Sequence, residues 1–224
     1  MRVLLVILLM LISLPVYALQ ATINLPNSEV LEEDTILMKD VTYVYPKGKV
    51  VNTAPNITYG VAHEIELSIG VPVIMNYDTD KTVVKSAIEG KKVFYIYDKN
   101  NRITVGAGIY PYLNKEISPE GFIFAHATRK IEKTGTSFSI GGYTSGDKTL
   151  LNSGGLLMIL DQKIYKDIHL LSEYTTGNGS RSNYSAGIKY KIKGVSITNS
   201  VIVPNHGNSI GFQLILAKTI GVKK

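Results

Sequence analysis

The 224-residue sequence contains no cysteine and no tryptophan, and its charge is moderate, with 24 Lys and Arg against 18 Asp and Glu. Without cysteine the chain cannot form a disulfide scaffold, a thiolate zinc site or a cysteine nucleophile. The hydrophobic content of 45% is too high for a disordered protein. These absences leave a folded chain that needs no covalent cross-link, with one domain or at most two small ones.

The one long apolar run lies at the N-terminus. It follows the basic residue Arg2, covers Val3–Pro15 and ends in Val16-Tyr17-Ala18, a pattern that predicts a signal peptide over 1–18. An uncleaved anchor is the alternative, although the run is short for a helix that needs about 20 residues to span a bilayer. We therefore expect an exported protein with an extended N-terminal segment over 19–34 and a folded domain over 35–224.

From about Thr35 onward, apolar residues recur at every second position, which is typical of amphipathic strands. One example runs from Tyr184 to Ile192, and in the apolar row that follows it Asn199 is the one break. The turn signals divide the chain into about twelve strands (10–14), beginning near Thr35, Pro55, Glu64, Lys91, Ile103, Phe122, Thr136, Gly155, Ile168, Asn183, Val195 and Ser209. A meander of this length avoids exposed edges by closing. The expected fold is an all-β, antiparallel, up-and-down transmembrane β-barrel.

Tyrosines tend to lie near the predicted strand ends, where an aromatic girdle would meet the two membrane interfaces. The alternative is that tyrosine is simply a good strand former. The residues that we assign to the girdle are Tyr59, Tyr77, Tyr110, Tyr174, Tyr184 and Tyr190.

Charged residues on the polar faces of the strands should point into the barrel, because a charge facing lipid at mid-membrane costs about 2–4 kcal/mol. The candidates for lumen residues that set selectivity are Glu66, Glu173, Lys189 and Lys191. In a soluble sandwich the same side chains would face water, so the pattern alone does not distinguish the two environments.

No set of residues indicates catalysis, a cofactor or a metal. The four histidines lie singly, without metal-ligand spacing. A lipid-modifying barrel enzyme would need a Ser–His pair, for which His126 with Ser137 or Ser139, or His206 with Ser209, are the available combinations. We expect no enzyme activity, no catalytic residue, no bound metal and no cofactor.

The stretch from Asn56 to Val73, which contains Tyr59-Gly60-Val61 and Glu66-Leu67, resembles a hairpin of bacterial outer-membrane barrels. These barrels are grouped with the meta-pathway phenol-degradation proteins and described as transporters. The extended segment and first strand that precede the hairpin are similar too. The resemblance implies an outer-membrane barrel. Alternation along the hairpin should place Tyr59 and the apolar row Ile65, Leu67 and Ile69 toward lipid, and Glu66 and Gly70 toward the interior.

Together these observations predict a porin-like barrel of the bacterial outer membrane. It would act as a passive channel or transporter for small molecules, hydrophobic ones included, or as a structural barrel whose own side chains largely fill its interior. The expected partners are outer-membrane lipid, the barrel-assembly machinery and a small-molecule cargo, with no nucleic acid. The alternatives are a soluble periplasmic or secreted barrel or sandwich that binds a ligand, and an outer-membrane enzyme acting on lipid.

Overall fold

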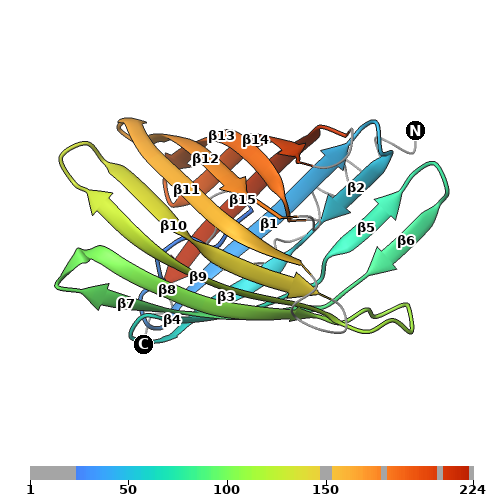
Figure 1. Ribbon diagram of the computed structural model, residues 1–224, viewed down its shortest axis with the longest axis horizontal. Helices are drawn as coiled ribbons and strands as arrows, with labels where there is room; N and C mark the ends of the chain where they lie inside the picture. Colours follow the sequence, from blue (N-terminus) through green and yellow to red (C-terminus); the bar gives the residue numbers. More distant parts are fainter. Residues whose placement is uncertain (1–23, 147–152, 178–180, 206–208, 222–224) are drawn as a thin grey trace.

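The computed structural model describes residues 24–146, 153–177, 181–205 and 209–221 and forms one antiparallel sheet rolled into a barrel (Figure 1). The predicted signal peptide lies outside these residues. The strands are β1 (Thr35–Tyr45), β2 (Val50–Thr53), β3 (Asn56–Ala62), β4 (Ile65–Gly70), β5 (Val73–Asn76), β6 (Lys81–Val84), β7 (Ala87–Ile96), β8 (Asp98–Tyr110), β9 (Glu120–Ile131), β10 (Thr136–Gly146), β11 (Ser153–Tyr165), β12 (Ile168–Thr175), β13 (Asn183–Ile192), β14 (Val195–Pro204) and β15 (Gly211–Gly221).

The barrel is closed by pairing of its first and last strands, from Thr35 opposite Gly221 to Val44 opposite Phe212. Three of its strands are interrupted, so β2 with β3, β4 with β5 and β6 with β7 each form one barrel strand. The 15 segments therefore make a twelve-stranded barrel. This confirms the predicted fold class and strand number, and it excludes the soluble sandwich.

Prolines lie at two of the three interruptions, and the third, between β6 and β7, falls at Lys85-Ser86. Pro55 separates β2 from β3, and Pro72 separates β4 from β5. A proline lacks the N–H that a central strand must donate, so it occurs at breaks and edges. The carbonyl oxygens still pair, since Pro55 accepts from Val71 and Pro72 accepts from Lys85. Beyond the breaks β2, β5 and β6 continue as a flap at the right-hand end of Figure 1.

The side chains alternate between a polar interior and an apolar exterior. On β4, Leu67 and Ile69 are 53% and 57% exposed, whereas Glu66 between Ile65 and Leu67 is fully buried. The same alternation runs through β14 and β15, where Val201, Val203 and Phe212 are exposed. Because apolar groups face outward around the barrel, the exterior matches the lipid-facing band of a transmembrane barrel. No helix among the described residues is long and apolar enough to cross a bilayer.

The two ends of the barrel differ in their connections. At the end where β1 begins and β15 finishes, the strands are joined by the short turns 63–64, 97, 132–135, 166–167 and 193–194. At the opposite end the connections are 46–49, 77–80, 111–119, 147–152, 176–182 and 205–210. We call these the turn end and the loop end. Outer-membrane barrels have short periplasmic turns and longer extracellular loops, so the turn end corresponds to the periplasmic side.

Candidate functional site

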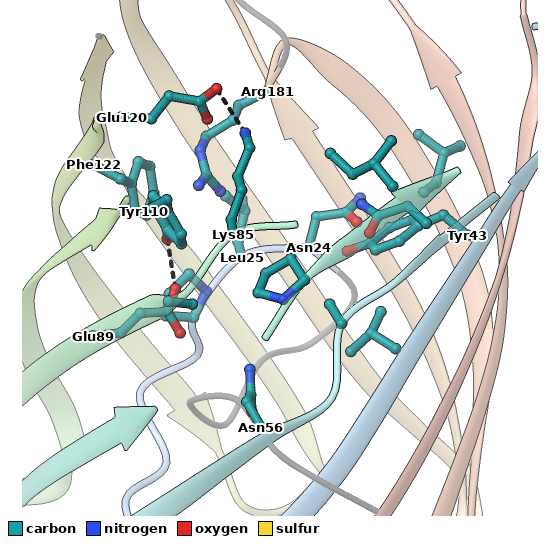
Figure 2. Close-up of a pocket in the computed structure, with 18 of the residues that line it drawn as sticks. Asn24, Leu25, Tyr43, Asn56, Lys85, Glu89, Tyr110, Glu120, Phe122 and Arg181 are labelled. Atoms are coloured by element: carbon teal, nitrogen blue, oxygen red, sulfur yellow. Dashed lines mark hydrogen bonds and ion pairs between the residues drawn. The ribbon is translucent and has the colours of Figure 1, made fainter. Parts of the chain in front are cut away.

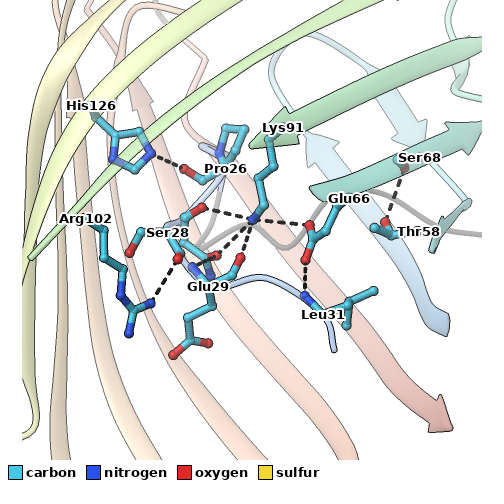
Figure 3. A network of polar contacts seen from close by, with 11 residues as sticks. Pro26, Ser28, Glu29, Leu31, Thr58, Glu66, Ser68, Lys91, Arg102 and His126 are labelled. Atoms are coloured by element: carbon cyan, nitrogen blue, oxygen red, sulfur yellow. Dashed lines mark hydrogen bonds and ion pairs between the residues drawn. The ribbon is translucent and has the colours of Figure 1, made fainter. Parts of the chain in front are cut away.

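The lumen holds a piece of the chain itself. Residues 24–34, which we call the lumen segment, run inside the barrel toward the turn end, where β1 begins (Figures 2 and 3). Leu25, Pro26, Ser28 and Leu31 are all buried. An extended chain inside a barrel must satisfy its backbone N–H and C=O groups with partners other than its own secondary structure, and most of these partners are side chains of the barrel wall.

Glu173 on β12 holds the loop-end side of the lumen segment. Its Oε2 accepts from the backbone nitrogen of Asn24 at 2.7 Å and its Oε1 from that of Leu25 at 3.3 Å. The side-chain amide nitrogen of Asn24 also donates to Ser185 Oγ at 2.8 Å. Glu173 is 2% exposed, so its charge is compensated by hydrogen bonds that are stronger than those between neutral groups.

Glu66 and Lys91 hold the middle of the segment. Their side chains are both fully buried and form an ion pair at 3.2 Å. The remaining Glu66 oxygen accepts from the backbone nitrogen of Leu31 at 2.6 Å, while Lys91 donates to the carbonyls of Asn27, at 3.0 Å, and Glu29. Figure 3 shows these contacts converging on Lys91. One buried ion pair therefore binds three backbone groups of the segment.

Two further side chains bind carbonyls of the segment from β8 and β9. His126 Nε2 lies 3.1 Å from the carbonyl oxygen of Pro26, a contact that requires a proton on Nε2. Its Nδ1 then accepts from the Thr128 hydroxyl at 3.1 Å. Arg102 donates to the Ser28 carbonyl at 2.9 Å. The wall thus binds the main chain of the segment at successive residues, which fixes its path through the lumen.

At the turn end, the segment passes directly over Gly60 of β3. A Cβ on Gly60 would lie 2.2 Å from the carbonyl oxygen of Glu32, so only glycine leaves room for the segment. The adjacent Tyr59 hydroxyl donates to Asp34 Oδ1 at 2.6 Å, and Asp34 N donates to the Gly60 carbonyl at 3.0 Å. The Tyr-Gly pair of the hairpin thus anchors the point where the segment joins β1.

Leu25 anchors the segment to an apolar patch on the inner wall. It is 2% exposed and clusters with Ala87, Tyr110, Phe122, Phe124, Tyr143, Leu157 and Ile159. Complete burial of a leucine is worth about 1.5–3 kcal/mol. The segment is therefore held by apolar packing as well as by buried charges.

Above the segment, toward the loop end, the lumen contains a cavity of about 440 Å³ whose lining includes Asn24, Leu25 and Pro26 (Figure 2). Tyr43, Tyr110 and Phe122 contribute aromatic surface. Asn52 and Asn56 also line it, and the Oδ1 of each is buried without a hydrogen-bond partner. A cavity of this size is in the range of small-molecule sites, and the two oxygens can accept hydrogen bonds from a molecule within it.

Charged side chains of both signs line the cavity. Lys85 pairs with Glu120 at 2.7 Å. The Arg181 guanidinium lies 4.1 Å from the ring centroid of Phe122 and 5.2 Å from that of Tyr110, whose hydroxyl donates to Glu89. Lys39 is buried and also lines the cavity. The lining thus offers donors, acceptors and aromatic faces to a passing solute.

The predicted lumen residues occupy different places. Glu66 and Glu173 are buried in the lumen and bind the segment, as described above. Lys189 is buried near the turn end and pairs with Asp161 at 2.7 Å, and the same carboxylate accepts from His169 at 2.6 Å. Lys191 follows on the same face of β13 but is exposed near the turn end. Their predicted effect on selectivity stays a prediction.

Glu29 lies in the lumen segment among these lysines. Its side chain is exposed within the lumen, but the surrounding barrel still raises the pKa of its carboxyl; the ammonium groups of Lys189 and Lys191 outweigh that effect and hold the pKa below its usual value. The carboxylate is therefore stabilised in its charged form, which adds an electrostatic attachment between the segment and the wall.

The tyrosines expected in a girdle fall into two groups. Tyr59, Tyr174, Tyr184 and Tyr190 lie on the outward face, and Tyr77 lies in the connection between β5 and β6. The assignment of Tyr110 was wrong, because this residue points into the lumen and is 8% exposed. It follows Ile109, which faces outward, so strict alternation along β8 places Tyr110 inside.

The histidines do not form a catalytic arrangement in the described part of the chain. His126 contacts Thr128 and the segment, and Thr128 in turn bonds Ser139 at 2.7 Å, so no serine hydroxyl lies against the imidazole. His206 lies outside the described residues. Within the residues described, no group of acidic and histidine side chains could hold a metal ion. The absence of enzyme activity remains an expectation.

Comparison with known proteins adds the fold relationship. No family model and no curated protein matches the sequence. The KdgM porin superposes with a TM-score of 0.64 at 12% identity, over 82% of this chain and 98% of that one. The COG4313 outer membrane channel from Pseudomonas putida F1 gives 0.58 at 8% identity, over 87% and 98%. This chain has the fold of outer-membrane channels. Omp33 of Acinetobacter baumannii is similar as well, with a TM-score of 0.55 at 8% identity, over 84% and 99%.

Proposed function

We propose that this protein is an outer-membrane channel for small molecules whose lumen is narrowed by its own N-terminal segment. The observation that carries the proposal is the lumen segment, bound through its main chain by the buried residues Glu66, Lys91 and Glu173. A barrel with a purely structural role would need no solute-sized cavity. Here a cavity with polar and aromatic lining lies directly above the segment.

The mechanism is diffusion through the lumen without a covalent step. A solute entering from the loop end meets the cavity, where Asn52 and Asn56 accept hydrogen bonds and Lys39, Lys85 and Arg181 offer positive charge. Passage to the turn end then requires the segment to shift or the solute to pass beside it. Glu66 and Glu173 act on permeation mainly by holding the segment, because their carboxylates already bind its amides.

We also propose that this chain is related to the meta-pathway phenol-degradation barrels. The support is local: the hairpin over Asn56–Val73 holds Asp34 through Tyr59, passes Glu32 at Gly60 and binds Leu31 through Glu66. One known barrel of this fold, KdgM, has been seen with disordered oligogalacturonate. For this chain the cargo is a small molecule that fits a cavity of about 440 Å³, hydrophobic solutes included. Outer-membrane lipid and the barrel-assembly machinery are its proposed partners.

The test is single-channel conductance of the purified protein in planar bilayers. The full chain should show a small single-channel conductance and a low open probability. A variant lacking residues 24–33 should show a severalfold larger conductance. Heat-dependent migration on gels establishes that both barrels are folded. Absence of current from both folded proteins would contradict a channel, and equal currents from both would contradict narrowing by the segment.

A further inference from the structure

Asn199 interrupts the lipid-facing surface of β14. Its neighbours across the sheet are Ile188 and Leu214, both exposed and apolar. Asn199 itself is exposed, and within the described residues its side chain makes no hydrogen bond. An amide that faces hydrocarbon without a partner is costly, because lipid offers no hydrogen bonds. The position therefore calls for a partner from outside the barrel.

A second polar side chain faces outward nearby, on β1. Lys39 and Val41 line the cavity, so Asp40 between them points outward, where the Thr53 hydroxyl donates to its Oδ1 at 3.1 Å. The Val41 backbone N–H also donates to this carboxylate. An ionised carboxylate can accept about four hydrogen bonds, so about half of its capacity is unused by these contacts. The other outward-facing charged side chains of the described strands, Lys92, Lys99, Arg129 and Lys218, lie near the turn end.

The strand registers place Asp40 and Asn199 at the same membrane depth. Because the strands are tilted, each residue lies closer to the loop end than its partner on the preceding strand. The successive pairings show this, since they lead from Ile36 near the start of β1 to Thr144 near the loop end of β10. The residues between are Tyr59, Leu67, Gly90, Ala107 and Ile123. By the same rule Thr42, which is paired through Leu214 to Asn199, lies above it. With strands about 4.8 Å apart and tilted about 40°, the two strand steps from β14 to β1 place Thr42 about 6 Å above Asn199 along the membrane normal.

Asp40 lies two residues below Thr42 along β1, which lowers it by about 5 Å at this tilt. It is therefore level with Asn199 to within about 1 Å and displaced from it by about 12 Å around the barrel. Between the two lie Leu214 and Leu216 of β15, both exposed. One acceptor and one donor thus stand at equal depth on either side of a leucine pair.

We propose that a second copy of this chain covers this face, which we call the β14–β1 face, in a two-fold dimer within the membrane. In a two-fold dimer the same surface of both copies meets, so every contact between two different residues occurs twice, once in each direction. With the axis between Leu214 and Leu216, Asn199 of each copy donates to Asp40 of the other. The leucines meet at the centre, and both polar groups leave the lipid.

The absence of native cysteine allows a direct cross-linking test of this dimer. In outer membranes, the variant Leu216→Cys should form a disulfide-linked dimer on mild oxidation, because residue 216 lies beside the axis. The matched control is Val105→Cys on β8, which also faces lipid but lies outside the proposed interface. Dimer from Leu216→Cys alone supports the proposal, whereas monomer from both variants, or equal dimer from both, would overturn it.

An exchange of the two polar residues separates specific pairing from a general structural effect. Asn199→Asp sets two carboxylates against each other and should lower dimerisation in lipid about tenfold, as expected for loss of an intramembrane hydrogen bond at two symmetric sites. Asn199→Asp combined with Asp40→Asn restores a donor and an acceptor in reversed order and should restore the dimer. Heat-dependent gel migration reports folding for every variant. A folded exchange variant that remains as monomeric as Asn199→Asp would refute the pairing.

Discussion

Glu66 and Lys91 form a fully buried ion pair at 3.2 Å inside the barrel, and each also binds the backbone of the lumen segment. A second pair close by, Glu64 and Lys92, is 3.8 Å long, and each of its side chains is 32% exposed. A buried pair that loses one partner leaves an uncompensated charge, whereas an exposed pair contributes little. The two pairs therefore form a natural test and control.

Lys91→Met should detach the middle of the lumen segment. It removes the hydrogen bonds to Asn27 and Glu29 and leaves Glu66 unpaired, a loss of about 3–5 kcal/mol for a buried pair. Single-channel recording should show larger and more frequent openings. Lys92→Met breaks the partly exposed pair with Glu64 and removes a hydrogen bond to the His63 carbonyl. It should change the free energy of unfolding by about 1 kcal/mol or less and leave the currents unchanged. Equal effects of the two substitutions would contradict the assigned role of the buried pair.

Gly60→Ala should displace the turn-end part of the segment, because the new Cβ would lie 2.2 Å from the Glu32 carbonyl oxygen. Hydrogen–deuterium exchange should rise over residues 30–34. Gly142→Ala is the control, since a Cβ there meets nothing closer than 3.5 Å. The contact is not as described if the segment stays as protected in Gly60→Ala as in Gly142→Ala.

Leu25→Ala should weaken the apolar attachment of the segment to Phe122 and its neighbours. Truncation of a buried leucine costs about 2–5 kcal/mol, so the open probability of the channel should increase at every voltage. Leu25→Met keeps the volume and should cost less than about 1.5 kcal/mol. Equal open probabilities for Leu25→Ala and Leu25→Met would contradict this role of leucine packing.

The conductance should depend on acidity through Glu29. Because the folded pKa of its carboxyl is depressed, the attachment is complete above the ordinary value of 4.5 and is lost as pH falls through the lower, folded value. Acidification from pH 7 to pH 3 should therefore increase the current. Glu29→Gln lacks this group, so its current should respond less to the same change. An undiminished response in Glu29→Gln would show that other carboxylates account for it.

Much of the barrel could be predicted from the sequence, because a period of two fixes both the strands and the face on which each side chain lies. The alternation placed Glu66 and Glu173 inside and Leu67 outside, as found. Tyr110 was assigned to the girdle from its position near a strand end, although the same alternation places it in the lumen. Where the two signals conflict, the strand period determines the face.

The lumen segment was predicted to be extended, but its location was not. A local pattern carries no information about contacts such as Asn24 with Glu173, which are 149 residues apart. One of the alternatives was an interior largely filled by side chains, whereas in the structure part of the interior is filled by the chain itself. Two signals pointed in this direction: Glu66 and Lys91 on neighbouring inward faces needed partners, and Gly60 marked a close approach of another backbone.

The position of residues 24–34 inside the barrel can be tested with a pair of introduced cysteines. The Asn24 amide nitrogen lies 2.8 Å from Ser185 Oγ, while the adjacent residue Ala186 belongs to the outward face of β13. In intact membranes, Asn24→Cys with Ser185→Cys should be joined by a short thiol cross-linker, as measured by mass spectrometry, and Asn24→Cys with Ala186→Cys should not. Failure of the first pair to cross-link, or equal cross-linking of both, would contradict the account.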